Sequence, residues 1–206
     1  KCTTTSAQEW VIFDTERNPS NPADDYLYAN NSAAEASYQN RKIEVLDDGF
    51  QFYGSDPAVN NSGDTYIFAA FADRPGNNWD VNNIVTNEGL TTSKDNFDVL
   101  TWTGDGGSSR AITGLQFSPG LLWVKRRNSA LDHFLWDSVR GITKELYSNQ
   151  SYAEGTTTNK LVSFDSNGFT VKNSSAVNNN NDTYVAWVWK AGGTAVSNTD
   201  GSITSS

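Results

Sequence analysis

The chain repeats itself, and this internal duplication restricts the possible folds more than any other feature of the 206-residue sequence. Residues 11–17 and residues 134–140 each contain three apolar residues, an Asp, a hydroxyl residue, one variable position and an Arg. The matches continue in the same order downstream: Leu27 and Tyr28 with Leu146 and Tyr147, Asn30 with Asn149, Ala34 and Glu35 with Ala153 and Glu154, Gly49 and Phe50 with Gly168 and Phe169, 58–61 with 176–179, and 64–66 with 182–184. We therefore expect two tandem copies of one domain.

The second copy begins with a leader that the first copy lacks, at residues 98–104, 114–119 and 121–125. When the copies are aligned, Lys1 falls opposite Lys125, directly after the Leu-Leu-Trp-Val segment of the leader. We therefore expect a first copy that is truncated at its N-terminus. The expected divisions are a first copy at 1–72, a linker at 73–96, a second copy at 97–192, and a tail or the start of a further module, rich in Gly, Ser and Thr, at 193–206.

Many short apolar or alternating segments, separated by Gly and Asn, predict an all-β protein. The clearest expected strands are 66–71 and 184–189, which are rich in aromatic and β-branched residues. Hairpins are expected where Asp48-Gly49 and Asn167-Gly168 separate short apolar runs, with Gly supplying a positive φ. Residues 32–37 could form a helical turn or two at most. The pattern indicates an antiparallel, jelly-roll-like β-sandwich in each copy, with a single merged sheet system as the alternative.

Charge and composition exclude several classes of function. The formal net charge is −9, so the chain repels phosphate backbones and anionic lipid, and we expect no nucleic-acid partner. No stretch approaches 18 consecutive apolar residues, so we expect no membrane insertion. The single cysteine, Cys2, allows neither an internal disulfide nor a cysteine-based metal site.

The repeated charged positions are the first candidates for a site. Asp14 and Arg17 recur as Asp137 and Arg140, and each pair can either bind a ligand through the carboxylate or form a turn and an ion pair. We favour the structural role for these pairs. Two further carboxylates, Asp64 and Asp182, precede the strongest expected strands and also count as repeated structural positions.

Catalysis and metal binding find little support in the sequence. His133, the only histidine, is replaced by Trp10 in the other copy, so we expect a structural role for it and no catalytic residues. Acidic loops could donate oxygens to calcium, but none has the spaced carboxylates of a calcium-binding loop. We therefore expect no metal site and no cofactor, and calcium at one site is the alternative.

The tryptophans offer a second kind of site, because a sugar ring can stack on an exposed aromatic face. Most of the seven tryptophans are expected to fill the core. Trp79 lies outside the repeated block, and Trp187 matches Ala69 in the first copy, so these two rings are the candidate ligand-binding residues.

Four blocks of the second copy, at 114–125, 134–141, 163–170 and 181–193, resemble a tandemly repeated domain of marine and cyanobacterial phage tail proteins. The first copy is similar but more divergent, and residues 73–96 fit poorly. The resemblance implies a virion structural or host-recognition role outside the cell, with other virion or fibre subunits as partners and host-surface glycan as a further candidate. It brings no catalytic residues, and a homo-oligomer is expected by analogy with fibre proteins.

Two other classes of function remain open at this stage. A carbohydrate-binding β-sandwich module of a secreted or cell-surface protein predicts exposed rings in a groove. A glycan-degrading domain predicts two close carboxylates in a cleft.

Overall fold

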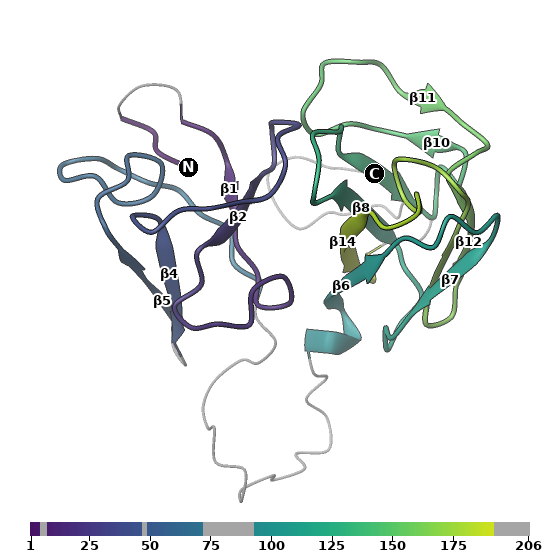
Figure 1. The fold of residues 1–206 in the computed structure, drawn as a ribbon, viewed down its shortest axis with the longest axis horizontal. Coiled ribbons are helices and arrows are strands. Elements are labelled where there is room, and N and C mark those ends of the chain that lie inside the picture. Colours follow the sequence, from purple (N-terminus) through teal and green to yellow (C-terminus); the bar gives the residue numbers. More distant parts are fainter. Residues whose placement is uncertain (5–7, 47–48, 72–92, 192–206) are drawn as a thin grey trace, which may run out of the picture.

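A computed structural model describes residues 1–4, 8–46, 49–71 and 93–191 of the chain. All regular elements in these ranges are β-strands except for one short 3-10 helix, η1 (Ser93–Asp95). The strands form several small antiparallel sheets, and in the described residues no strand of the first copy pairs with a strand of the second (Figure 1). The all-β class is therefore confirmed.

The largest sheet belongs to the second copy and has the order β6-β14-β8-β9. It contains β6 (Phe97–Thr103), β8 (Leu121–Arg126), β9 (Phe134–Asp137) and β14 (Thr183–Trp189). β14 pairs along its whole length with β6 and along most of it with β8, which fits an apolar sequence buried on both faces. Tyr184 and Ala186 face one core, whereas Val185 and Trp187 face another.

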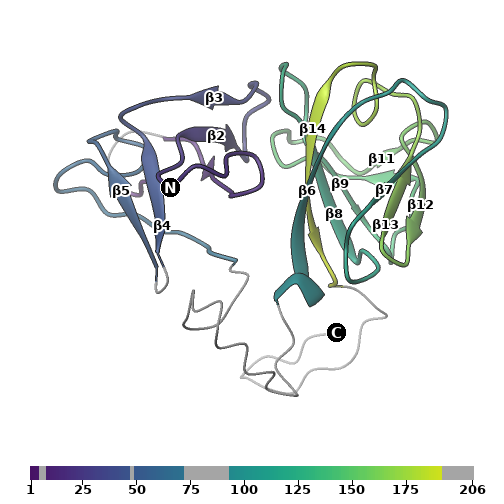
Figure 2. The same cartoon turned by 60° about the horizontal axis from the view of Figure 1, so that its bottom comes forward.

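Two smaller sheets complete the second copy. β7 (Arg110–Thr113), β12 (Leu161–Asp165) and β13 (Gly168–Val171) have the order β12-β13-β7, and β10 (Lys144–Glu145) pairs with β11 (Gly155–Thr156). Figure 2 shows β7, β12 and β13 on one side of the second copy, across from β6 and β14. Buried rings of Trp102, Phe169 and Tyr184 connect these sheets.

In its described residues the first copy forms two small sheets, which Figure 2 shows. One contains β1 (Val11–Ile12), β2 (Asp25–Tyr28) and β3 (Ala36–Ser37), and the other contains β4 (Lys42–Leu46) and β5 (Gly49–Tyr53). Few large apolar side chains are fully buried here, and Leu27 packs against the second copy.

Strand pairing repeats between the two halves of the sequence. The pair Ile12–Leu27 in β1 and β2 corresponds to the bridge between Leu135 and Leu146. The β2-β3 pair has the same register as the β10-β11 pair, and the β4-β5 hairpin has the register of β12-β13 next to its turn. The sequence repeat is therefore also a repeat of backbone hydrogen bonding.

Both predicted hairpins are present, but glycine acts differently from the expectation. Gly168 is the first residue of β13 and has no positive φ; Asn181 is the one non-glycine residue with positive φ in the described part. A Cβ atom at Gly168 would lie 2.0 Å from the carbonyl oxygen of Ile112 in β7, so glycine is needed for the close approach of two strands.

Two predicted elements differ in the structure. The strand expected at residues 66–71 is reduced to an isolated bridge between Cys2 and Tyr66, because no neighbouring strand lies beside the rest of this segment in the described residues. Its counterpart β14 lies between β6 and β8. The helical turn considered at residues 32–37 is absent: residues 32–35 have no regular secondary structure and lead into β3, and Glu35 binds the second copy through its backbone and side chain.

Candidate functional site

The repeated Asp-x-x-Arg motif forms a closed turn in the first copy. The Asp14 carboxylate accepts hydrogen bonds from the Arg17 backbone N–H at 2.9 Å and from Arg17 Nε at 2.5 Å. Arg17 also donates to the Ile12 carbonyl at 3.0 Å and to Glu35 Oε2 at 2.7 Å. The Arg17 side chain has no exposed surface, so every contact of this cation is internal.

The same turn recurs in the second copy. Asp137 accepts from the backbone N–H of Arg140 at 2.8 Å and from its Nε at 2.5 Å. Partial burial raises the pKa of Asp137, but the bonds and charge of Arg140 outweigh this effect and lower that pKa below its usual value. Arg140 reaches Glu154 at 3.4 Å, as Arg17 reaches Glu35. Here the side chains are partly exposed.

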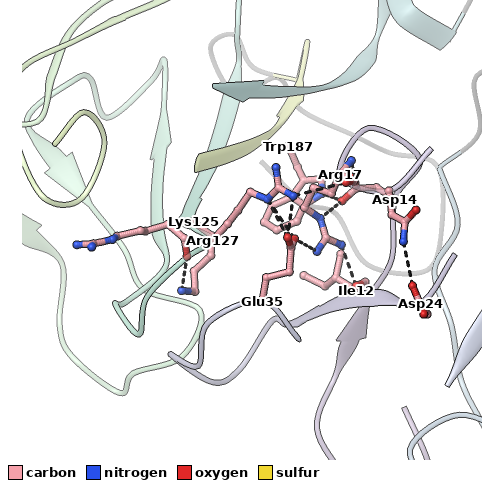
Figure 3. A network of polar contacts seen from close by, with 10 residues as sticks. Ile12, Asp14, Arg17, Asp24, Glu35, Lys125, Arg127 and Trp187 are labelled. Atoms are coloured by element: carbon pink, nitrogen blue, oxygen red, sulfur yellow. Dashed lines mark hydrogen bonds and ion pairs between the residues drawn. The ribbon is translucent and has the colours of Figure 1, made fainter. Parts of the chain in front are cut away.

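Glu35 carries the first-copy turn into contact with the second copy. Its Oε1 accepts from Arg127 Nη2 at 2.7 Å and from Arg127 Nε at 3.0 Å, while Oε2 binds Arg17 (Figure 3). The Glu35 backbone N–H also donates to the Arg127 carbonyl at 2.8 Å. A carboxylate between two guanidinium groups is a strong, geometrically specific contact. Glu35 therefore fixes one copy against the other.

Trp187 lies against this cluster from the second copy. Its Nε1 donates to Asp14 Oδ2 at 3.1 Å, and the Arg17 guanidinium lies 5.7 Å from the ring centroid. The ring is 4% exposed. The expectation of an open ring at Trp187 is therefore corrected: the first copy covers it, which leaves no face for a sugar. Trp79, the other candidate, lies outside the described residues.

An apolar contact surrounds the polar cluster, and we call the two together the inter-copy joint. Leu27 and Ile12 of the first copy pack against Val99, Val185 and Trp187 of the second. This contact covers part of the outer face of the β6-β14-β8-β9 sheet, over β6, β8 and β14. The joint therefore combines apolar burial with a charge network, both of which disfavour sliding of one copy over the other.

His133 occupies a buried position at the edge of the joint. Trp123 Nε1 donates to its Nδ1 at 2.8 Å, and its Nε2 lies 3.2 Å from the Asn31 carbonyl of the first copy. These partners require a neutral ring with the proton on Nε2. Burial, aided by the charge of Lys125, lowers the pKa of His133 to about 4. The expected structural role fits this arrangement, and the ring has no surface for a substrate.

The remaining repeated carboxylates stabilise matched turns. Asp64 accepts from Asn61 Nδ2 at 2.9 Å, and Asp182 accepts from Asn179 Nδ2 at 2.6 Å. Asp182 also pairs with Arg126 at 2.7 Å. These carboxylates organise the chain before the β14 strand and its first-copy counterpart.

The structure places Asp14, Arg17 and Trp187 together, whereas Asp64 and Asp182 lie in separate turns. Sequence reasoning missed Arg127 and did not single out Glu35, although Glu35 has a matched Glu154. In the described ranges no group of three or more His, Cys, Asp or Glu side chains could hold a metal ion, and no helix is long and apolar enough to cross a membrane.

Fold and site together define an all-β protein whose two halves repeat the same turns and whose joint is a buried polar and apolar contact. The model of the family described as a domain of unknown function (DUF7483) matches residues 1–75 and 92–206, and the chain belongs to this family. No curated protein and no solved structure matches the chain.

Proposed function

We propose that this chain is a non-catalytic structural module of a phage tail or tail fibre, built from two copies of one jelly-roll-like β-sandwich domain. The observation that carries the proposal is the inter-copy joint, in which the recurring charged motif is used to hold neighbouring copies. A rigid connection between successive copies is what an extended particle made of repeated domains needs. The resemblance of the second copy to a repeated phage tail domain points to the same role.

The sandwich topology is part of this proposal. In the second copy, the β6-β14-β8-β9 sheet and the β12-β13-β7 sheet share one buried apolar cluster. Trp102 of β6 stacks on Tyr184 of β14 and contacts Phe169 of β13. Two antiparallel sheets that enclose one core are the arrangement of a β-sandwich. The first copy would share this plan through its matching registers.

The charged residues support a structural role over a catalytic one. An acid or base for catalysis must reach a substrate, but Arg17 and His133 are buried and Glu35 lies between two arginines. The burial of Trp187 also weakens the alternative of a carbohydrate-binding module. Contact with host-surface glycan and assembly into a homo-oligomer remain proposals for surfaces outside the joint.

Detection of the protein in purified virions tests the proposed role. Antibodies against the whole chain should label tails or fibres in electron micrographs of phage that encode it, and peptides of the chain should co-purify with virions through a density gradient. Recovery only in the soluble fraction of the lysate would overturn the proposal. A glycan array probed with the whole chain distinguishes the alternative, since strong selective binding without virion association supports the carbohydrate-binding module.

A further inference from the structure

The segment 67–71 of the first copy exposes large apolar side chains at positions that are buried in the second copy. Ile67 is 48% and Phe68 71% exposed, whereas their counterparts Val185 and Ala186 have no exposed surface. Phe71 is 59% exposed, although one part of its ring contacts Phe97 and Trp189 of the second copy. Contiguous exposed apolar side chains of this kind mark a surface that a partner covers.

Strand pairing shows where that partner would lie. Cys2 bridges to Tyr66, and the Ile67 backbone N–H donates to the Lys1 carbonyl at 3.0 Å. These contacts repeat the pairing of Arg126 with Tyr184 and of Lys125 with Val185 in β8 and β14. Lys1 and Cys2 therefore pair with this segment in the register of the last two positions of β8. The other positions of a β8-type strand would lie beside the segment 68–71.

Gly49 supplies an independent observation. Its counterpart Gly168 has to be glycine because β7 approaches closely, and a Cβ at that position would lie 2.0 Å from the Ile112 carbonyl oxygen. A Cβ at Gly49 would meet nothing within 4 Å. Glycine weakens a strand unless another backbone approaches too closely for a side chain. Its presence in β5 is explained if a β7-type strand also pairs with β5.

We propose that the first copy is an acceptor for a leader segment of the type found at residues 97–124. Its β8-type and β6-type strands would pair on the two sides of the segment 67–71, and its β7-type strand would pair with β5. Exposed strand edges readily accept a further strand through main-chain hydrogen bonds. This inference rests on the repeat and does not depend on the proposed virion role.

The test extends the whole chain with a second copy of residues 97–124 placed immediately before Lys1. Hydrogen exchange is then measured at the amides of residues 68–71. The expected result is exchange slowed at least about tenfold relative to the unextended chain, because these amides become part of a sheet. Binding of a hydrophobic dye to the protein should fall in parallel.

The matched control carries the same extension with the leader counterparts of Leu122 and Val124 changed to Asp, since both residues are fully buried in the second copy. This control should leave the amides at 68–71 in fast exchange, while unchanged exchange in β14 shows that the second copy remains folded. In the extended chain, Gly49→Ala should reverse at least part of the protection.

Equal exchange at residues 68–71 in the native and Asp-substituted extensions would overturn the proposal. A second overturning result is a dimer of the unextended chain that already protects these amides and that Phe68→Asp dissociates. In that case a second copy of the chain, and not a leader, covers the surface.

Discussion

Trp187 Nε1 donates to the carboxylate of Asp14, a residue 173 positions earlier in the chain, across a distance of 3.1 Å. The bond joins the central strand of the second copy to the repeated turn of the first. In the second copy the matched carboxylate, Asp137, receives its side-chain hydrogen bond from Arg140 and lies partly exposed. The Asp-x-x-Arg motif therefore forms part of the joint in the first copy and lies at the surface in the second. Substitutions at matched positions of the two copies can be compared for this reason.

Removal of the Glu35 charge should weaken the joint. Glu35→Gln leaves Arg127 without its charged partner across the joint and leaves Arg17 with Asp14 alone, and it should lower the free energy of unfolding by about 2 kcal/mol, since the carboxylate is largely buried between two cations. The measurement is urea denaturation followed by tryptophan fluorescence. Glu154→Gln is the control, and its partly exposed pair should cost within about 0.5 kcal/mol. Equal effects of the two changes would contradict the role given to Glu35.

Truncation of Trp187 should be much more damaging than loss of its hydrogen bond. Trp187→Ala should cost about 3–5 kcal/mol because a large buried ring leaves a cavity, whereas Trp187→Phe should cost about 1 kcal/mol. Calorimetric or urea unfolding measures both. Tyr152→Ala, at an exposed ring of the second copy, serves as the control and should change little. A small effect of Trp187→Ala would show that the joint does not form as described.

Acid should destabilise the protein through His133. The folded protein keeps this ring neutral down to about pH 4, whereas the unfolded chain takes up a proton near pH 6.5. The contribution of His133 to stability is therefore fully present above pH 6.5 and decreases as the pH falls toward 4, by at most about 3 kcal/mol. Unfolding free energies measured across this range should show the slope. His133→Gln should flatten this part of the profile, and parallel profiles would refute the assignment.

Trp136 tests the cost of an unsatisfied polar group. The ring is fully buried in the second copy, and its Nε1 has no hydrogen-bond partner. Trp136→Phe, the residue at the matched position Phe13, removes this orphan donor at the expense of some volume and should change stability by less than about 1 kcal/mol. Trp136→Ala should cost about 3–5 kcal/mol. Thermal unfolding compares the two, and a loss for Phe as large as for Ala would show that the indole N–H contributes to the fold.

The close approach of β7 and β13 can be tested at matched glycines. Gly168→Ala should destabilise the protein because its Cβ would collide with the Ile112 carbonyl, and repair requires movement of two strands. Gly49→Ala should be close to neutral in the unextended chain, since its Cβ would meet nothing within 4 Å. Melting temperatures of the two variants provide the comparison. A similar fall in both would show that glycine is needed at this strand position whether or not a neighbouring strand approaches closely.

Local patterns in the sequence predicted the parts of the fold that depend on local chemistry. The apolar run of β14, the two hairpins and the Asp-x-x-Arg turns all follow from strand propensity, turn residues and short-range hydrogen bonds. The segment 67–71 has an equally strong strand sequence but forms no sheet, because a strand also needs neighbours. Strand propensity alone cannot reveal whether those neighbours are present.

The joint was beyond prediction for a different reason. Glu35 and Arg127 are 92 positions apart, and neither position has a neighbour in sequence that indicates its partner. Trp187 differs from its counterpart Ala69, which marked it as peculiar to the second copy, yet the difference could indicate either a ligand or a covering domain. Only the three-dimensional arrangement places Asp14 at the indole N–H of Trp187 and Arg17 over the ring.

Asp25 of the first copy corresponds to Lys144 of the second, so the two copies carry opposite charges at this matched position. Burial, the nearby charge of Glu35 and that of Asp24 raise the pKa of Asp25, whereas the charges of Arg17 and Arg127 oppose this effect. In the second copy Lys144 lies 3.5 Å from Glu154 and supplies the positive charge locally.

Because the joint packs a turn of one domain against the sheet of the next, it is a heterologous contact. A row of domains joined in this way would have a direction, with a turn displayed at one end and a sheet at the other.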